Sequence, residues 1–233
     1  MDKKKIDRER KRQEQMRKQL WAARDQFYAK HNPLSASDAV IEQFLEETAH
    51  IDMEPETRLI FFTDYERFGW DGVSKIHRYV IDRNPDQTFE YVSWINEGLA
   101  LMGDKDKDVE FRTQVAQDVE KLIQEASAKE TEEWVAGYWA DYYLQHPMRN
   151  DQDPIWLQQA AKWLELLKDA DDYDYHQLCK LADVYREQGR LDEAACLYTE
   201  ALSCNVPGCC ETTRNVEERL AMCKPSNSMK STG

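Results

Sequence analysis

The spacing of apolar residues between positions 175 and 207 predicts two short amphipathic helices. In the first half of this stretch, apolar side chains recur three or four residues apart, which places them on one face of a helix. They are Leu178, Leu181, Ala182 and Tyr185. After Gly189 the same spacing returns, in Ala194, Leu197, Tyr198, Ala201 and Leu202. The two stripes therefore predict antiparallel helices joined by a tight turn at Gly189.

Small and large residues are combined in the two stripes. The alanines leave room for a neighbouring backbone, while Tyr185 and Tyr198 fill the wider gaps beside them. Together with the turn glycine, these residues fall on the pattern of the tetratricopeptide repeat, a helix-turn-helix unit of about 34 residues. The stretch 175–207 resembles that family, with Leu178 where a Trp is common and Pro207 displaced by one position.

The resemblance implies a row of stacked helix pairs, because a single pair cannot bury its own apolar face. Upstream, apolar stripes at helical spacing predict further pairs that begin near residues 56, 87 and 131. Strand-like alternation of β-branched residues is hard to find. We therefore expect an all-α protein, an α-solenoid of antiparallel helix pairs similar to a tetratricopeptide superhelix. The later pairs start about 44 residues apart, which departs from the family's period of about 34.

Breaks in the helical pattern predict three parts. They are a long basic N-terminal helix at 1–33, a helical repeat domain at 34–224 with its best-matching repeat at 175–207 and its closing helix at 211–222, and a flexible tail at 225–233. Asn32-Pro33 ends the first part, because a residue that precedes proline disfavours the helical conformation. Inside the domain, the sequence predicts a helix from Glu56 to Phe68, followed by a turn at 69–72.

Charge is distributed unevenly along the chain, whose net charge is −14. Residues 1–30 contain 11 Lys and Arg against 5 Asp and Glu, a surplus of six positive charges, which leaves −20 for the rest. An acidic body argues against binding of a nucleic-acid backbone there, since such binding depends on Lys and Arg. It favours basic or apolar partners.

Neither a secretory signal nor a membrane span is visible in the sequence. The first residues are charged without an apolar core, and no apolar run approaches the roughly 20 residues of a spanning helix. We therefore expect a cytoplasmic protein without a membrane partner.

Catalytic motifs are also hard to find, and we predict a protein that is not an enzyme and needs no cofactor. The sequence has no HExxH, no phosphate-binding loop, no GxSxG and no dinucleotide fingerprint. Glu47 and His50 form one ExxH pair, but di-iron sites use two such pairs with two further glutamates. Ordinary surface polarity explains this pair.

The six cysteines all lie in the last fifth of the chain. Cys204, Cys209, Cys210 and Cys223 could meet where the last repeat turns into the closing helix, and four thiolates suit tetrahedral zinc. The spacing lacks the CxxC knuckle that usually fixes such a site, so packing thiols and a disulfide or redox role remain open as well. Cys179 and Cys196 lie beside the core stripes, and we interpret them as structural.

The resemblance implies a peptide ligand on the concave face of the array, lined by the first helix of each pair. On the matched repeat, the positions that would face it are His176, Cys179, Asp183 and Arg186. Some members of the family grip a C-terminal carboxylate with Lys and Asn. Here Asp183 stands where that Asn is expected, so this particular ligand is not supported.

The predicted function is that of a protein-binding adaptor that holds another protein or peptide. Two alternatives remain. The first is a factor that binds nucleic acid or an acidic partner through the basic N-terminal helix, although that helix lacks the interleaved aromatics of single-strand binders. The second is a metal or redox protein that uses the C-terminal cysteines. The sequence leaves the oligomeric state open.

Overall fold

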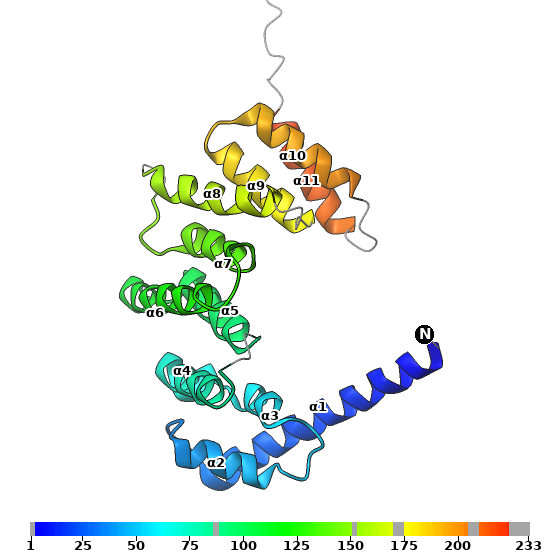
Figure 1. Ribbon diagram of the computed structural model, residues 1–233, viewed down its shortest axis with the longest axis vertical. Helices are drawn as coiled ribbons and strands as arrows, with labels where there is room; N and C mark the ends of the chain where they lie inside the picture. The colour runs from blue at the N-terminus through cyan, green and yellow to red at the C-terminus, as the bar shows by residue number, and fades with distance from the viewer. Residues whose placement is uncertain (1–2, 86–88, 151–152, 170–174, 205–209, 224–233) are drawn as a thin grey trace, which may run out of the picture. The chain divides into compact units, whose positions relative to one another are not determined.

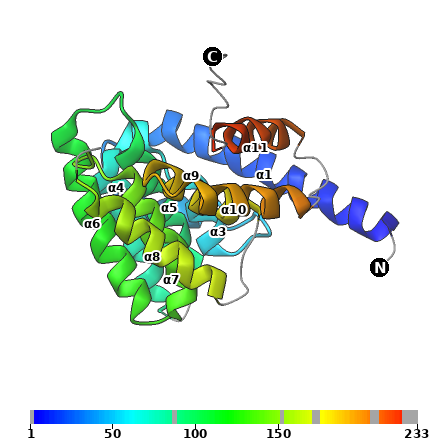
Figure 2. The same ribbon diagram turned by 90° about the horizontal axis from the view of Figure 1, so that it is seen from above.

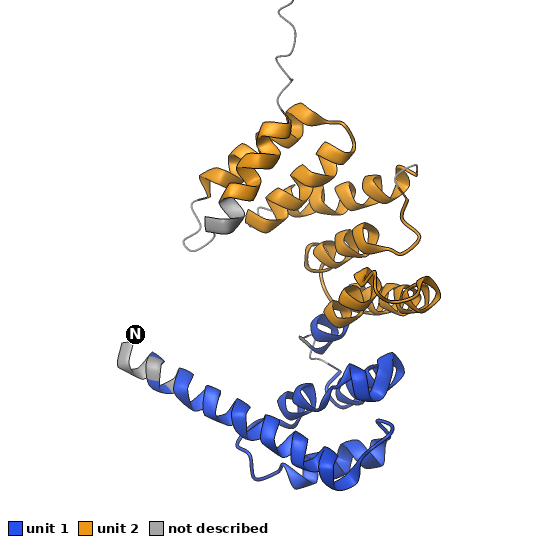
Figure 3. Cartoon of the chain, turned by 180° about the vertical axis from the view of Figure 1, so that it is seen from behind, with its two compact units in different colours: residues 1–94 blue, residues 95–233 orange. Residues whose placement is uncertain are grey.

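The computed structural model is helical throughout its core and describes residues 3–85, 89–150, 153–169, 175–204 and 210–223. No strand occurs in these segments, which confirms the predicted all-α class. The chain divides into two compact units, residues 1–94 and 95–233, and the division falls within α5 (Phe89–Gly103) (Figure 3). The predicted tail at 225–233, Pro207 and Cys209 lie outside the described residues, and the predicted domain limits stay predictions.

Unit 1 contains α1 (Lys3–His31), α2 (Asp38–Glu47), α3 (Pro55–Phe62), α4 (Tyr65–Arg83) and the start of α5. Its core is aromatic: the rings of Phe44 and Phe62 stack at 4.5 Å, and the Tyr28 hydroxyl donates to the Phe62 carbonyl at 2.5 Å. Only the C-terminal half of α1 contributes to this core. From Arg10 to Gln19 its side chains are exposed apart from the half-buried Met16, and this half extends from the rest of the unit (Figure 3).

The predicted single helix from residue 56 to residue 68 is wrong, because it is interrupted at residues 63–64. It ends at Phe62, because the Asp64 side chain accepts a hydrogen bond from the Arg67 backbone at 3.1 Å and so caps a new helix, α4. The predicted four-residue turn at 69–72 is reduced to Gly69, whose φ of 64° kinks α4. Gly72 is helical, and a Cβ there would lie 2.5 Å from the Cβ of Phe68.

Arg58 is a buried cation in unit 1 that satisfies the end of a helix. Arg58 is only 7% exposed. Its guanidinium donates hydrogen bonds to the Leu45 carbonyl at 2.9 Å and to the Thr48 hydroxyl at 3.3 Å. The last carbonyls of α2 have no partner inside the helix and carry partial negative charge. Arg58 therefore caps α2 from a neighbouring helix.

Unit 2 continues from α5 with six further helices that pack in succession. They are α6 (Val109–Ser127), α7 (Glu132–Gln145), α8 (Ile155–Asp169), α9 (Tyr175–Glu187), α10 (Leu191–Ser203) and α11 (Cys210–Met222). From α6 to α11, each helix packs against the next in the chain (Figures 1 and 2). Within unit 2 this is the predicted row of helix pairs.

The best-matching repeat has the structure that its sequence predicts. Gly189 lies in the turn between α9 and α10 with a φ of 78°, a left-handed conformation that glycine adopts without strain. Ala182 and Ala194 are fully buried where the two helices meet, and Tyr198 is fully buried beside them.

Among the described residues, no helix is both long and apolar enough to cross a membrane.

Candidate binding groove

Two neighbouring hollows lie beside α8 in unit 2 and share Leu157 and Glu187 in their linings. The first, here the turn hollow, has a volume of about 560 Å³; it is lined by Pro154, Leu157, Gln158, Ala161, Lys162, Glu165, Glu187, Gln188 and Arg190. The second, here the loop hollow, has a volume of about 840 Å³; it is lined by Gly103, Lys105, Arg112, Leu144, Gln145, His146, Pro147, Arg149, Leu157 and Glu187. We call the two together the α8 groove.

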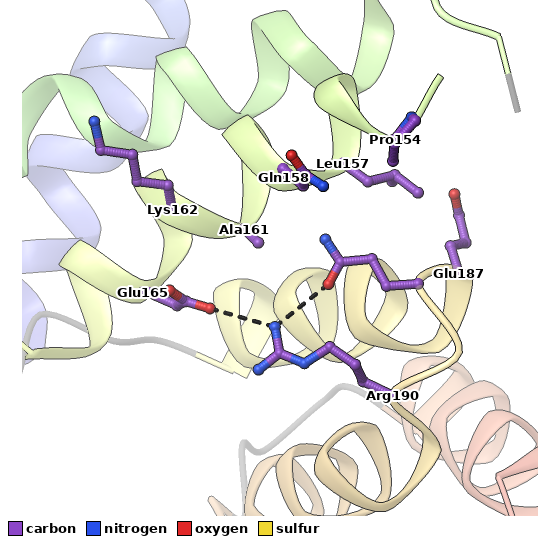
Figure 4. Close-up of a pocket in the computed structure, with 9 residues that line it drawn as sticks. Pro154, Leu157, Gln158, Ala161, Lys162, Glu165, Glu187 and Arg190 are labelled. Atoms are coloured by element: carbon purple, nitrogen blue, oxygen red, sulfur yellow. Dashed lines mark hydrogen bonds and ion pairs between the residues drawn. The ribbon is translucent and has the colours of Figure 1, made fainter. Parts of the chain in front are cut away.

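One face of α8 forms a wall of the turn hollow, and the turn between α9 and α10 lies opposite (Figure 4). Helical spacing brings Leu157, Ala161 and Glu165 to the same side of α8, because residues four apart lie one above the other. The exposed Gln158 and Lys162 flank them. This face combines a narrow apolar strip with polar side chains that reach into solvent.

Arg190 organises the opposite side of the turn hollow. Its guanidinium donates to both carboxylate oxygens of Glu193 at 2.7 and 2.6 Å and lies 3.7 Å from Glu165. It also lies over the Tyr185 ring, 3.6 Å from the centroid. The Tyr185 hydroxyl donates to Glu165 at 2.6 Å, and burial together with this bond raises the pKa of Tyr185 to about 12. These contacts connect α8 to the turn and fix the rim.

Two arginines in the loop hollow are held by the ends of helices. Arg112 donates through Nε to the Met102 carbonyl at 2.8 Å, near the end of α5. Arg149 donates to the Leu144 carbonyl at 2.9 Å, near the end of α7, and pairs with Glu187. Cationic donors at these positions satisfy carbonyls that lack partners within the helix.

His146 lies between the loop hollow and an aromatic cluster. Its ring stacks on Trp156 with centroids 4.4 Å apart, and its Nδ1 accepts a hydrogen bond from the Met148 backbone at 3.2 Å. Burial lowers the pKa of His146, so the ring is neutral near pH 7. The cluster continues to Tyr143, whose ring lies 6.2 Å from that of Trp156. It holds the end of α7 against the start of α8.

The four peptide-contact residues expected from the sequence lie on α9, and two of them face α11. His176 is exposed and Cys179 is buried. Asp183 accepts hydrogen bonds from Tyr198 at 2.6 Å, from Arg219 at 2.6 Å and from Arg186 at 3.3 Å. Both Asp183 and Arg186 are thus engaged within the chain, and the peptide-binding role of the four stays a prediction.

The other candidate sites are also placed by the structure. Glu47 of the ExxH pair accepts hydrogen bonds from Lys30 at 3.0 Å and His31 at 2.7 Å, and the Lys30 bond chiefly lowers the pKa of Glu47. Among the described residues, no three His, Cys, Asp or Glu side chains are grouped to hold a metal. Cys209 and the side chain of Cys210 lie outside that part, so the four-thiolate hypothesis stays a prediction.

Sequence reasoning missed the α8 groove. Leu157 and Ala161 belong to an apolar stripe that predicts core, and the polar residues beside them look like any solvated helix face. Arg149 and Glu187 are 38 positions apart, and no local pattern connects them. Only the packing of α8 between its neighbours brings these residues together.

The comparisons with known proteins find a similar fold among solved structures. No protein-family model matches the sequence, and a search of curated proteins finds no match. A search of solved structures finds the crystal structure of a thermophilic TPR protein from Thermus thermophilus, with a TM-score of 0.49 and 17% sequence identity. The alignment covers 88% of this chain and 97% of that one. This likeness concerns the fold alone.

Proposed function

We propose that this chain is a non-catalytic protein-binding module that holds an extended polypeptide segment in the α8 groove. The observation that carries the proposal is that two neighbouring hollows share Leu157 and Glu187 in their linings. Two hollows of about 560 and 840 Å³ that share part of their lining offer successive positions, as a peptide with several side chains requires.

The lining of the groove suits a peptide chemically. Leu157, Ala161 and Leu144 supply apolar surface for side chains. Gln158 and Gln145 carry amide groups, each with a donor and an acceptor, that can pair with the main chain of a bound segment. The combination of an apolar strip and polar anchors is typical of surfaces that recognise side chains and backbone together.

The rim of the groove is already fixed before a ligand arrives. Arg190 is bonded to Glu193 and Tyr185 to Glu165. Ordering flexible side chains costs free energy on binding, and this cost is smaller when the side chains are held beforehand.

A selection experiment tests the proposal. The full chain is immobilised and presented with a phage library of random peptides of about 12 residues, and selected peptides are then measured by fluorescence anisotropy. Leu157→Arg places a charged side chain in the apolar strip and should weaken binding at least about tenfold. Leu34→Arg, a substitution of the same kind at a residue 85% exposed in unit 1, should leave binding unchanged. Failure to select any peptide, or equal binding by Leu157→Arg and wild type, would overturn the proposal.

The exposed half of α1 supports a second candidate function. Arg8, Arg10 and Lys11 are exposed, and the Arg12 guanidinium reaches Asp52 at 2.5 Å. A protruding basic helix can attract a nucleic-acid backbone or an acidic protein. Anisotropy with a labelled DNA duplex at rising salt tests the first of these partners. Binding that persists after deletion of residues 1–19 would exclude the exposed half of α1 as the cause.

A further inference from the structure

The loop hollow carries an excess of positive charge that the turn hollow lacks. Three cations line it, Lys105, Arg112 and Arg149, against the single carboxylate of Glu187. In the turn hollow, two cations and two carboxylates balance. The excess is notable because residues 31–233 together carry a net charge of −20.

In the part of the chain that the structure describes, two of the three cations have donors without an acceptor in the protein. Arg149 is occupied by Glu187 and the Leu144 carbonyl. Arg112 uses Nε on the Met102 carbonyl, and among the described residues no acceptor engages its two terminal nitrogens. The Lys105 ammonium group likewise has no acceptor in the described part of the chain.

The guanidinium of Arg112 is also held in place. It is half-buried, and its Nε bond to α5 restricts the remaining rotations of the side chain. A planar guanidinium with free terminal nitrogens matches the two oxygens of a carboxylate. Because the side chain is fixed beforehand, little conformational entropy is lost when that bond forms.

We propose that the loop hollow binds a carboxylate side chain of the peptide, with Arg112 and Lys105 as its partners. This inference rests on the proposed function and specifies the peptide: an Asp or Glu lies in the loop hollow, an apolar residue lies over Leu157, and an uncharged stretch follows through the turn hollow. The uneven charge of the two hollows sets the direction of the chain. The net charge of −20 over residues 31–233 disfavours the same carboxylate at other positions.

The peptide selection described above tests the inference when the wild type is compared with two variants, Lys105→Glu and Lys75→Glu. Peptides selected on the wild type should be enriched in Asp or Glu at one position. Lys105→Glu should weaken the best acidic peptide at least about fivefold, and a peptide with Lys in place of that acidic residue should bind the variant better. Lys105 makes no bond within the described residues, so this substitution should leave folding intact. Lys75→Glu, at an exposed lysine of unit 1, is the matched control and should change nothing.

The possible outcomes separate the two proposals. Peptides that bind the groove without acidic enrichment would overturn the carboxylate site and leave the proposed function standing. A selection that yields no peptide would overturn both. A competition experiment shows which anion the loop hollow binds. N-acetylglutamate should displace the acidic peptide from the protein, and N-acetylglutamine should not. Displacement by inorganic phosphate alone would assign the hollow to phosphate and overturn the carboxylate site.

Discussion

Arg219 of α11 donates a hydrogen bond to Asp183 of α9 at 2.6 Å, and the same carboxylate accepts from Tyr198 of α10. One side chain thus connects three helices at the end of unit 2. Val216 of α11 is 1% exposed, so an apolar contact accompanies the ion pair. The last helix is held on the side of α9 that carries Asp183 and Arg186.

We predict that Asp183 and Arg219 stabilise the fold cooperatively. Both side chains are about a third exposed, so solvent screens their attraction, and we expect a coupling free energy of about 1 kcal/mol. Urea unfolding of Asp183→Asn, Arg219→Met and the double variant measures it in a double-mutant cycle. Additive effects of the two substitutions would show that the ion pair does not fix α11.

Arg58, which caps α2, should contribute more to the free energy of unfolding than an arginine on the surface. Arg58→Met leaves the Leu45 carbonyl without its partner and should lower the free energy of unfolding by about 2 kcal/mol. Arg17→Met, at an exposed position of α1, should change it by less than about 0.5 kcal/mol. Chemical denaturation of both variants checks the difference, and equal values would contradict the capping role.

Two glycines in open space should respond to alanine in opposite directions. Gly189 has a φ of 78° with nothing near its missing Cβ, so Gly189→Ala should destabilise by about 1 kcal/mol through backbone strain alone. Gly137 lies within α7, also with open space around it, and Gly137→Ala should stabilise by about 0.5–1 kcal/mol. Thermal melting of the two variants measures both effects. If Gly189→Ala and Gly137→Ala shifted the melting temperature in the same direction, the assignment of Gly189 to the turn would be refuted.

The stability of the protein should depend on His146 below neutral pH. Burial lowers the pKa of His146 beneath its unfolded value of about 6.5, so the unfolded chain binds more protons in acid. The contribution of neutral His146 to the free energy of unfolding is therefore fully present above the unfolded pKa. It is lost as the pH falls through the pKa of His146 in the folded state. Urea unfolding between pH 7.5 and 5 should show a steeper loss for wild type than for His146→Gln. Parallel curves would contradict the prediction.

The described cysteines should differ in reactivity. Cys196 and Cys204 are exposed, whereas Cys179 and Cys223 are buried, and burial raises the pKa of both buried thiols. Because the thiolate is the reactive form, brief treatment with iodoacetamide should label the exposed pair first. Mass spectrometry locates the label. Rapid labelling of Cys179 or Cys223 would contradict this order of reactivity.

Local patterns were sufficient to predict much of the fold. The Ala and Tyr spacing around Gly189 gives α9 and α10, because the same small residues that set the spacing are the ones buried between the helices. The boundary between α3 and α4 was missed because apolar residues continue across it, and the side chain that ends the pattern, Asp64, acts through a single capping bond.

The candidate groove was not predictable in the same way. Arg112 and Arg149 are charged residues in ordinary helical and loop sequence, and their meaning depends on carbonyls at the ends of α5 and α7. Asp183 was expected to face a ligand, yet its partner Arg219 lies 36 positions away. Contacts between distant segments decide these roles, and one sequence does not display them.

Crosslinking tests the central claim most directly. Benzoylphenylalanine is introduced singly at Gln158, in the α8 groove, and at His176, on the α9 surface expected from the sequence; both side chains are exposed. After irradiation with a selected peptide, mass spectrometry compares the yields of crosslinked protein. Binding in the α8 groove predicts a crosslink from position 158 and none from position 176. A crosslink from position 176 alone would contradict it.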